Sequence, residues 1–112
     1  MDLPEPTRIL WADVCRDGGS FELGFLTADG REFKLKLPVK RGKAGWFRPA
    51  ALRVGYLPPV LSGPSSADQI LDWQQADRLS TLLRPLVQAG IEAGGAQRAE
   101  EMLQFLSMGG AL

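Results

Sequence analysis

Two stretches in which apolar and polar residues alternate most constrain how this chain folds. Residues 21–25 (FELGF) and 33–39 (FKLKLPV) both carry apolar side chains at their odd-numbered positions. A period of two is typical of a β-strand with one buried face. We therefore predict two strands that point the same set of residues toward one core.

The short segment between these strands determines how they pair. A two-residue turn at Asp29-Gly30 would place Phe25 opposite Lys34 and mix the buried and exposed faces. A three-residue loop with Gly30 in the left-handed region instead gives a type I turn with a G1 bulge. We predict this second register, which pairs Phe25 with Phe33, Leu23 with Leu35, Phe21 with Leu37, and, on the other face, Glu22 with Lys36.

A third strand is predicted upstream, over residues 8–16. It meets the strand at 21–25 through Asp17-Gly18, a pair typical of two-residue hairpin turns. This turn sets Val14 opposite Phe21, Ala12 opposite Leu23 and Leu10 opposite Phe25. The other face then carries Trp11 (opposite Gly24), Asp13, Cys15, Glu22, Lys34 and Lys36.

The second half of the chain has the pattern of amphipathic helices. Ser66 with Gln69 forms a capping-box pattern that predicts a helix from about Ala67. Pro85 lacks a backbone donor, so we expect a kink or break near Arg84. Apolar residues follow helical spacing up to a Gly94-Gly95 stop: Leu79, Leu82, Leu83, Leu86, Val87, Gly90 and Ile91.

A last helix is predicted from about Ala96 to Met108. It buries Ala99, Met102, Leu103 and Leu106, and Gly109-Gly110 follows it. Phe105 and Met108 lie partly off that stripe, which means either deep burial or a contact with a second chain. A homo-oligomer through this helix is therefore one expectation.

These elements predict an α+β fold in a single domain over residues 1–112. An N-terminal three-stranded antiparallel meander (1–39) leads through a Gly/Pro-rich connection (40–66) to a helical layer (67–112) with two or three helices. Residues 52–56 are a candidate short fourth strand. The meander needs the helices because one of its faces is apolar.

Composition excludes several classes of function. The chain has 112 residues, thirteen basic and thirteen acidic, with one cysteine and no histidine, so the common zinc sites and an internal disulfide are ruled out. We predict no metal and no cofactor. The absence of a membrane-length apolar run and of a signal-peptide pattern predicts a cytoplasmic protein without membrane contact.

Catalysis has little support in the residues. Histidine, the usual acid-base group near neutral pH, is missing, and Cys15 has no histidine to activate it. Asp13 and Glu22 fall side by side in the predicted register, so a carboxylate-based hydrolase is a weaker alternative. We expect these two carboxylates to be ordinary solvated groups and the protein not to be an enzyme.

The distribution of charge is the most unusual feature. Residues 30–56 hold eight basic residues and one acidic residue, interleaved with aromatic ones. We predict a non-catalytic interaction module, such as an adaptor, small inhibitor or assembly subunit, that binds an acidic protein surface through this region. The predicted partner-binding residues are Lys34, Lys36, Lys40, Arg41, Lys43, Trp46, Phe47, Arg48 and Arg53.

Two other interpretations of this segment stay open. Basic groups beside flat aromatic rings also suit a nucleic-acid-binding module that follows a phosphate backbone and stacks bases. Alternatively, Trp46, Phe47 and Tyr56 fold onto the core, and the basic residues only balance the acidic flanks.

Overall fold

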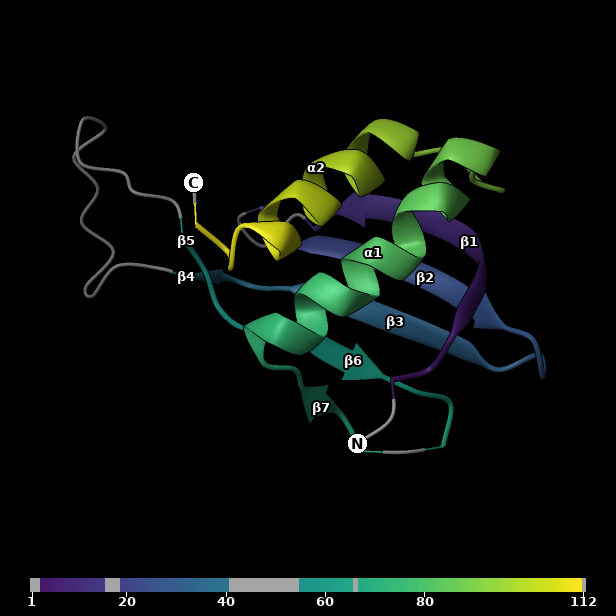
Figure 1. Cartoon of the computed structure of the whole chain (residues 1–112), viewed down its shortest axis with the longest axis horizontal. Helices are drawn as coiled ribbons and strands as arrows, with labels where there is room; N and C mark the ends of the chain where they lie inside the picture. The colour runs from purple at the N-terminus through teal and green to yellow at the C-terminus, as the bar shows by residue number, and fades with distance from the viewer. Residues whose placement is uncertain (1–2, 16–18, 41–54, 66, 112) are drawn as a thin grey trace.

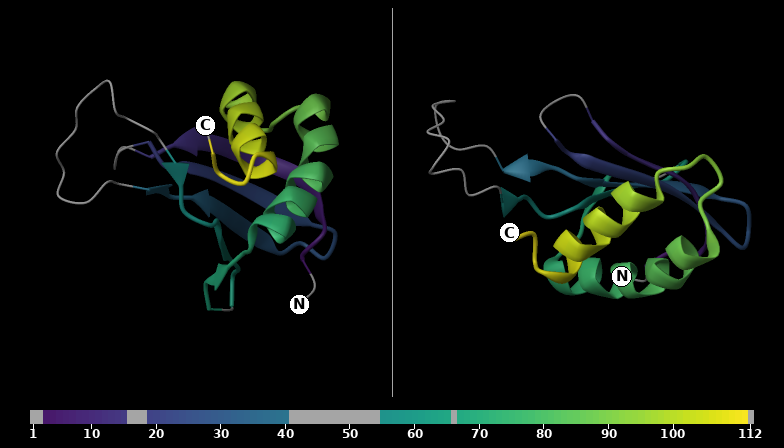
Figure 2. Two further views of the ribbon diagram at one scale, coloured as in Figure 1. Left: turned by 60° about the vertical axis from the view of Figure 1, so that its left-hand side comes forward. Right: turned by 90° about the horizontal axis from the view of Figure 1, so that it is seen from above.

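The computed structural model describes residues 3–15, 19–40, 55–65 and 67–111, and within them the fold is a two-layer α+β arrangement. Antiparallel strands form a main sheet in the order β1-β2-β3-β6-β7, and β4 with β5 forms a short ribbon. Both helices lie on one face of the main sheet (Figures 1 and 2). The elements are β1 (Pro6–Val14), β2 (Phe21–Thr27), β3 (Glu32–Leu37), β4 (Val39–Lys40), β5 (Gly55–Tyr56), β6 (Val60–Ser62), β7 (Gln69–Ile70), α1 (Trp73–Ala89) and α2 (Ala96–Ser107).

The β2–β3 hairpin has the predicted register. Phe25 pairs with Phe33 and Leu23 with Leu35, and Gly30 has a φ of 82°, as the three-residue loop requires. Thr27 donates a side-chain hydrogen bond to Asp29, which, with further help from Arg31, lowers the pKa of that carboxyl. Polar groups of the loop thus fix the turn that aligns the strands.

The pairing of β1 with β2 is as predicted at one end and wrong at the other. Val14 lies opposite Phe21 and Ala12 opposite Leu23, but Ile9 rather than Leu10 pairs with Phe25. A register irregularity between Ile9 and Trp11 accounts for this, because a bulge adds a residue and exchanges the two faces. Ile9 is fully buried as a result. The predicted Asp17-Gly18 turn falls outside the described residues.

One strand of the main sheet, β6, comes from the connection predicted to be irregular, and another, β7, comes from the predicted start of the first helix. β6 pairs with β3, setting Leu61 opposite Leu35, and β7 pairs with β6. The expected fourth strand over 52–56 is described only at Gly55–Tyr56, where β5 pairs with β4 instead of joining the main sheet.

The first helix begins later than predicted. Gln69 and Ile70 are extended in β7, so no helix starts at Ala67. The capping box is formed instead by Asp72 and Gln75: each side chain accepts a hydrogen bond from the other residue's backbone N–H. α1 therefore begins at Trp73, directly after this cap.

Pro85 does not break α1, which continues to Ala89 and ends at Gly90. Pro85 is exposed, so its ring meets solvent and not the packed face. The Gly94-Gly95 pair precedes α2 and does not end α1. Leu82, predicted to be buried, is 40% exposed.

α2 and its buried stripe agree with the prediction. The core between the two layers is formed by Ile9, Ala12, Phe21, Leu23, Phe25, Phe33, Leu35, Leu37, Leu61, Leu71, Ala76, Leu79, Leu83, Val87, Ala99, Met102, Leu103 and Leu106. Burial of these side chains is the main term that stabilises the fold.

The connection between the two helices covers the outer edge of β1. The backbone N–H groups of Glu92 and Ala93 donate to the carbonyls of Ile9 and Leu10, at 3.3 Å and 3.0 Å. A Cβ atom on Gly95 would lie 3.2 Å from the carbonyl carbon of Ala12 and closer still to its oxygen. The edge is therefore paired and closely packed, which opposes edge-to-edge aggregation.

Gly95 and its neighbour Gly94 provide a matched test of this close packing. Both have a positive φ, of 91° and 83°, but nothing lies within 4 Å of a Cβ built on Gly94. We expect Gly94→Ala to lower the free energy of unfolding by about 1 kcal/mol from backbone strain alone. Gly95→Ala should cost about 3 kcal/mol, because its methyl group also meets β1. Urea denaturation measures both, and equal losses would contradict the contact.

Candidate interaction surface

The second face of the main sheet carries no helix among the described residues, as the view from above in Figure 2 shows. Its side chains lie in two rows across the strands. One row contains Asp13, Glu22, Lys36, Val60 and Ile70, and the next contains Trp11, Gly24, Lys34 and Ser62. We call these nine residues the open face.

Trp11 is the largest side chain of the open face, and it rests on Gly24. A Cβ atom on Gly24 would lie 2.6 Å from Cε2 of the indole and 3.1 Å from its Cδ1. Gly24 is buried, while Trp11 stays half-buried. The predicted pairing of these two residues is confirmed, and only a glycine leaves room for the ring.

Opposite charges lie beside the tryptophan. Nζ of Lys34 is 3.5 Å from Oε1 of Glu22 in a diagonal ion pair, while Lys36 lies directly opposite Glu22, as predicted. Asp13 accepts a hydrogen bond of 2.8 Å from the backbone N–H of Val14. The two carboxylates predicted to be neighbours are thus adjacent in register, but each interacts with a different group.

An apolar end completes the open face. Ile70 is 73% exposed, the most exposed of the large apolar side chains described, and the half-buried Val60 is its partner in register. Neither residue was predicted from the sequence, because the capping-box pattern assigned Ile70 to a helix and the Gly/Pro-rich pattern assigned Val60 to a loop. An exposed isoleucine at one edge of a sheet face that also carries two lysines and, at its other edge, a tryptophan is typical of a surface that meets another protein.

The structure places only some of the predicted partner-binding residues. Lys34 and Lys36 lie on the open face, and the backbone of Lys40 lies in β4. The other predicted residues fall outside the described residues: Arg41, Lys43, Trp46, Phe47, Arg48 and Arg53. Their role therefore stays a prediction.

The described residues on either side of the segment 41–54 are held together in the β4–β5 ribbon. Lys40 pairs with Gly55, and Gly55 forms a further bridge with Ala111. The backbone N–H of Tyr56 donates to the carbonyl of Gly110 at 2.9 Å. The ribbon thus lies beside the C-terminal end of α2 (Figure 1).

An aromatic cluster holds this ribbon against the helical layer. The ring of Tyr56 lies 4.7 Å from that of Phe105 and 6.0 Å from that of Phe21, between centroids. Phe105, which the sequence left between burial and contact with a second chain, packs within its own chain. Tyr56, which one of the alternative interpretations places on the core, packs against it and is partly buried. Met108 remains 47% exposed.

Other chemistry finds little in the described residues. Cys15 is half-buried, and no group of three or more carboxylate or thiol side chains that could hold a metal is present in the described ranges. Neither α1 nor α2, nor any other described segment, forms an apolar helix of membrane-spanning length.

Substitution at Gly24 tests the seat of Trp11. Gly24→Ala should displace the indole and shift its N–H resonance in a ¹⁵N spectrum, because the new methyl group overlaps the ring. Gly109→Ala is the control, since nothing lies within 4 Å of a Cβ built there and the residue is outside the main sheet. An unmoved Trp11 resonance in Gly24→Ala would show that the ring does not rest on this glycine.

Tyr56 is the one tyrosine of the chain, so its titration reports on the ribbon. Burial, and secondarily the charge of Glu101, raise the pKa of its phenol above the usual value of about 10. Stability from the neutral phenol is therefore present below that value and lost as pH rises through the folded pKa. Absorbance at alkaline pH should show a raised pKa that Glu101→Gln lowers only in part, since burial is the larger cause. A pKa at the ordinary value would contradict the packing.

The chain matches no known family model, no curated protein and no solved structure. Comparison with known proteins therefore assigns no role to the open face or to the ribbon.

Proposed function

We propose that this protein is a non-catalytic interaction module of the cytoplasm that binds an acidic protein surface through the open face and the basic residues of the segment 41–54. The observation that carries the proposal is one-sided burial. Helices cover one face of the main sheet, and the other face presents Trp11, Lys34 and the 73% exposed Ile70 together.

The composition of the open face suits a protein partner. Trp11 offers a rigid aromatic side chain that stays half-buried, and Ile70 with Val60 adds an apolar contact at the other side. Interfaces commonly combine such aromatic and aliphatic anchors with a polar surround. Lys34 and Lys36 lie between the two apolar parts, so a partner that covers the face must also accommodate their ammonium groups.

The preference for an acidic partner is supported by the neighbouring sequence. The segment 41–54 contains four basic residues and no acidic one, and the residues that flank it, Lys40 and Gly55, pair in the ribbon. A partner seated there would gain from negative charge, which accelerates association and sets its orientation. The lone cysteine and the absence of histidine agree with a role that needs no reactive group.

Two exposed apolar residues on opposite sides of the molecule make the test specific. Affinity capture with the unmodified protein should retain a partner that Ile70→Asp no longer binds. Ile70→Lys should still bind it, because an acidic partner repels aspartate and tolerates lysine. Leu82→Asp is the matched control, since Leu82 is 40% exposed on α1. Capture is compared by mass spectrometry, and the purified partner is then titrated calorimetrically.

The alternative predictions give different results in the same series. If Asp and Lys at position 70 weaken binding equally, the partner is not acidic. Sequence-independent binding of DNA or RNA that falls steeply with salt would identify a nucleic-acid-binding module instead. Retention of the partner by Ile70→Asp together with its loss from Leu82→Asp would move the interface to the helical layer and overturn the proposal.

A further inference from the structure

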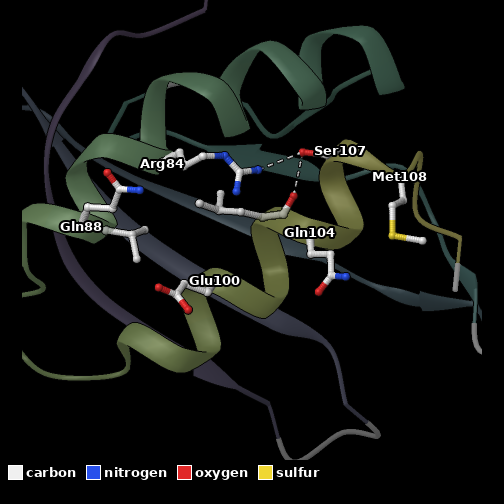
Figure 3. A pocket seen from close by; sticks show the side chains of 8 residues that line it. Arg84, Gln88, Glu100, Gln104, Ser107 and Met108 are labelled. Carbon is white, nitrogen blue, oxygen red and sulfur yellow. Dashed lines mark hydrogen bonds between the residues drawn. The ribbon is translucent and has the colours of Figure 1, made fainter.

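A groove between α1 and α2 lies on the side of the helical layer that faces away from the sheet (Figure 3). It has a volume of about 450 Å³, within the range of small-ligand sites. Val87 and Leu103 are buried and form its apolar floor, while polar side chains form its walls. The groove shares no residue with the open face.

One wall presents a positive charge that is held in place without being neutralised. Nη2 of Arg84 donates to the Ser107 hydroxyl at 3.3 Å, and that hydroxyl lies 3.0 Å from the carbonyl of Leu103 and 3.1 Å from the hydroxyl of Ser80. In the described parts of the chain Arg84 has no carboxylate partner. A guanidinium oriented by a neutral hydroxyl keeps its charge available for an anion.

The opposite wall presents a negative charge that also has no oppositely charged partner among the described residues. On α2 the neighbouring Glu101 takes the ion pair with Arg98, at 3.4 Å, and the amide of Gln97 as well. Glu100 lines the groove, and its carboxylate forms no ion pair or hydrogen bond with the described residues. The groove thus offers a cation site and an anion site that do not neutralise each other.

The spacing of these charges defines the size of a ligand. Arg84 contacts Ser107, and Glu100 lies seven residues before Ser107 on α2, about 10 Å along the helix axis at 1.5 Å per residue. An extended chain advances about 3.3 Å per residue, so three residues span a similar distance. Gln88 lines the groove from α1 and Gln104 lines it from α2, and their amides can both donate and accept hydrogen bonds.

We propose that this groove binds a short peptide of about three residues with free termini. The peptide carboxylate contacts Arg84 and its amino terminus contacts Glu100. The two glutamine amides face the peptide backbone, and the apolar floor takes the middle side chain. Charge at both ends and an apolar residue between them distinguish this ligand from the acidic protein surface proposed for the open face.

The tripeptide Ala-Leu-Ala is a suitable probe, titrated into the ¹⁵N-labelled full chain. Shifts should concentrate at Val87, Gln88, Leu103 and Gln104 and saturate at millimolar peptide. N-acetylated and C-amidated forms should each bind about five-fold more weakly, the equivalent of about 1 kcal/mol for a partly exposed charge pair.

Variants assign each end of the peptide. Arg84→Gln should abolish the preference for the free carboxylate over the amide while keeping the preference for the free amine, and Glu100→Gln should do the reverse. Arg78→Gln and Glu32→Gln, at exposed positions that do not line the groove, are the matched controls and should change neither preference. Circular dichroism confirms that each variant is folded.

Three results would overturn the proposal. They are the absence of saturable shifts in the groove, shifts that map to the open face instead, and blocked peptides that bind as well as the free one. Because the Ile70 series does not involve these residues, the peptide site and the proposed function fail or succeed independently.

Discussion

The turn at residues 28–30 sets the pairing on which the rest of the structure depends. Its Gly30 adopts a left-handed conformation, so the loop contains three residues and Phe25 meets Phe33. A slip of one residue would turn the lysines of β3 toward α1 and α2, because side chains alternate between the two faces of a strand. Burial of uncompensated ammonium groups is costly enough to exclude that arrangement. The buried face and the open face are thus determined together.

One-sided burial then shapes what the surface offers. The helices cover the face with the apolar odd-numbered residues of β2 and β3, and the even-numbered residues remain on the other side. Glycine at position 24 removes a side chain from that exposed row and gives Trp11 its seat. The ring is therefore half-buried instead of fully exposed, which reduces the apolar area that this face presents to solvent.

The sequence was sufficient where a pattern extends over many residues. The β2–β3 register, the inward set of those strands and the buried stripe of α2 are confirmed because periodicity and turn chemistry agree there. Leu10 was wrongly chosen over Ile9, since a bulge leaves no periodic signal in an apolar run. β6 and β7 are too short for periodicity and owe their extended form to pairing, β6 with β3 and β7 with β6. Pro85 lies on the exposed side of α1, so its ring does not disturb the packing against the sheet.

The same limits apply to the candidate site. Alternation assigns Lys34 and Lys36 to the face without helices, where the register places them, whereas Ile70 was assigned to a helix and its position on that face was not predicted. Arg84 was considered only as the residue before a proline, since the groove exists only once two helices are packed together.

α2 takes part in two features of the molecule. On one side, Phe105 packs against Tyr56 and so holds the β4–β5 ribbon against the helical layer. On another side, Glu100 and Gln104 line the groove against α1. Because the buried stripe of α2 fixes how the helix is rotated on the sheet, the same stripe determines which of its residues reach the ribbon and which line the groove.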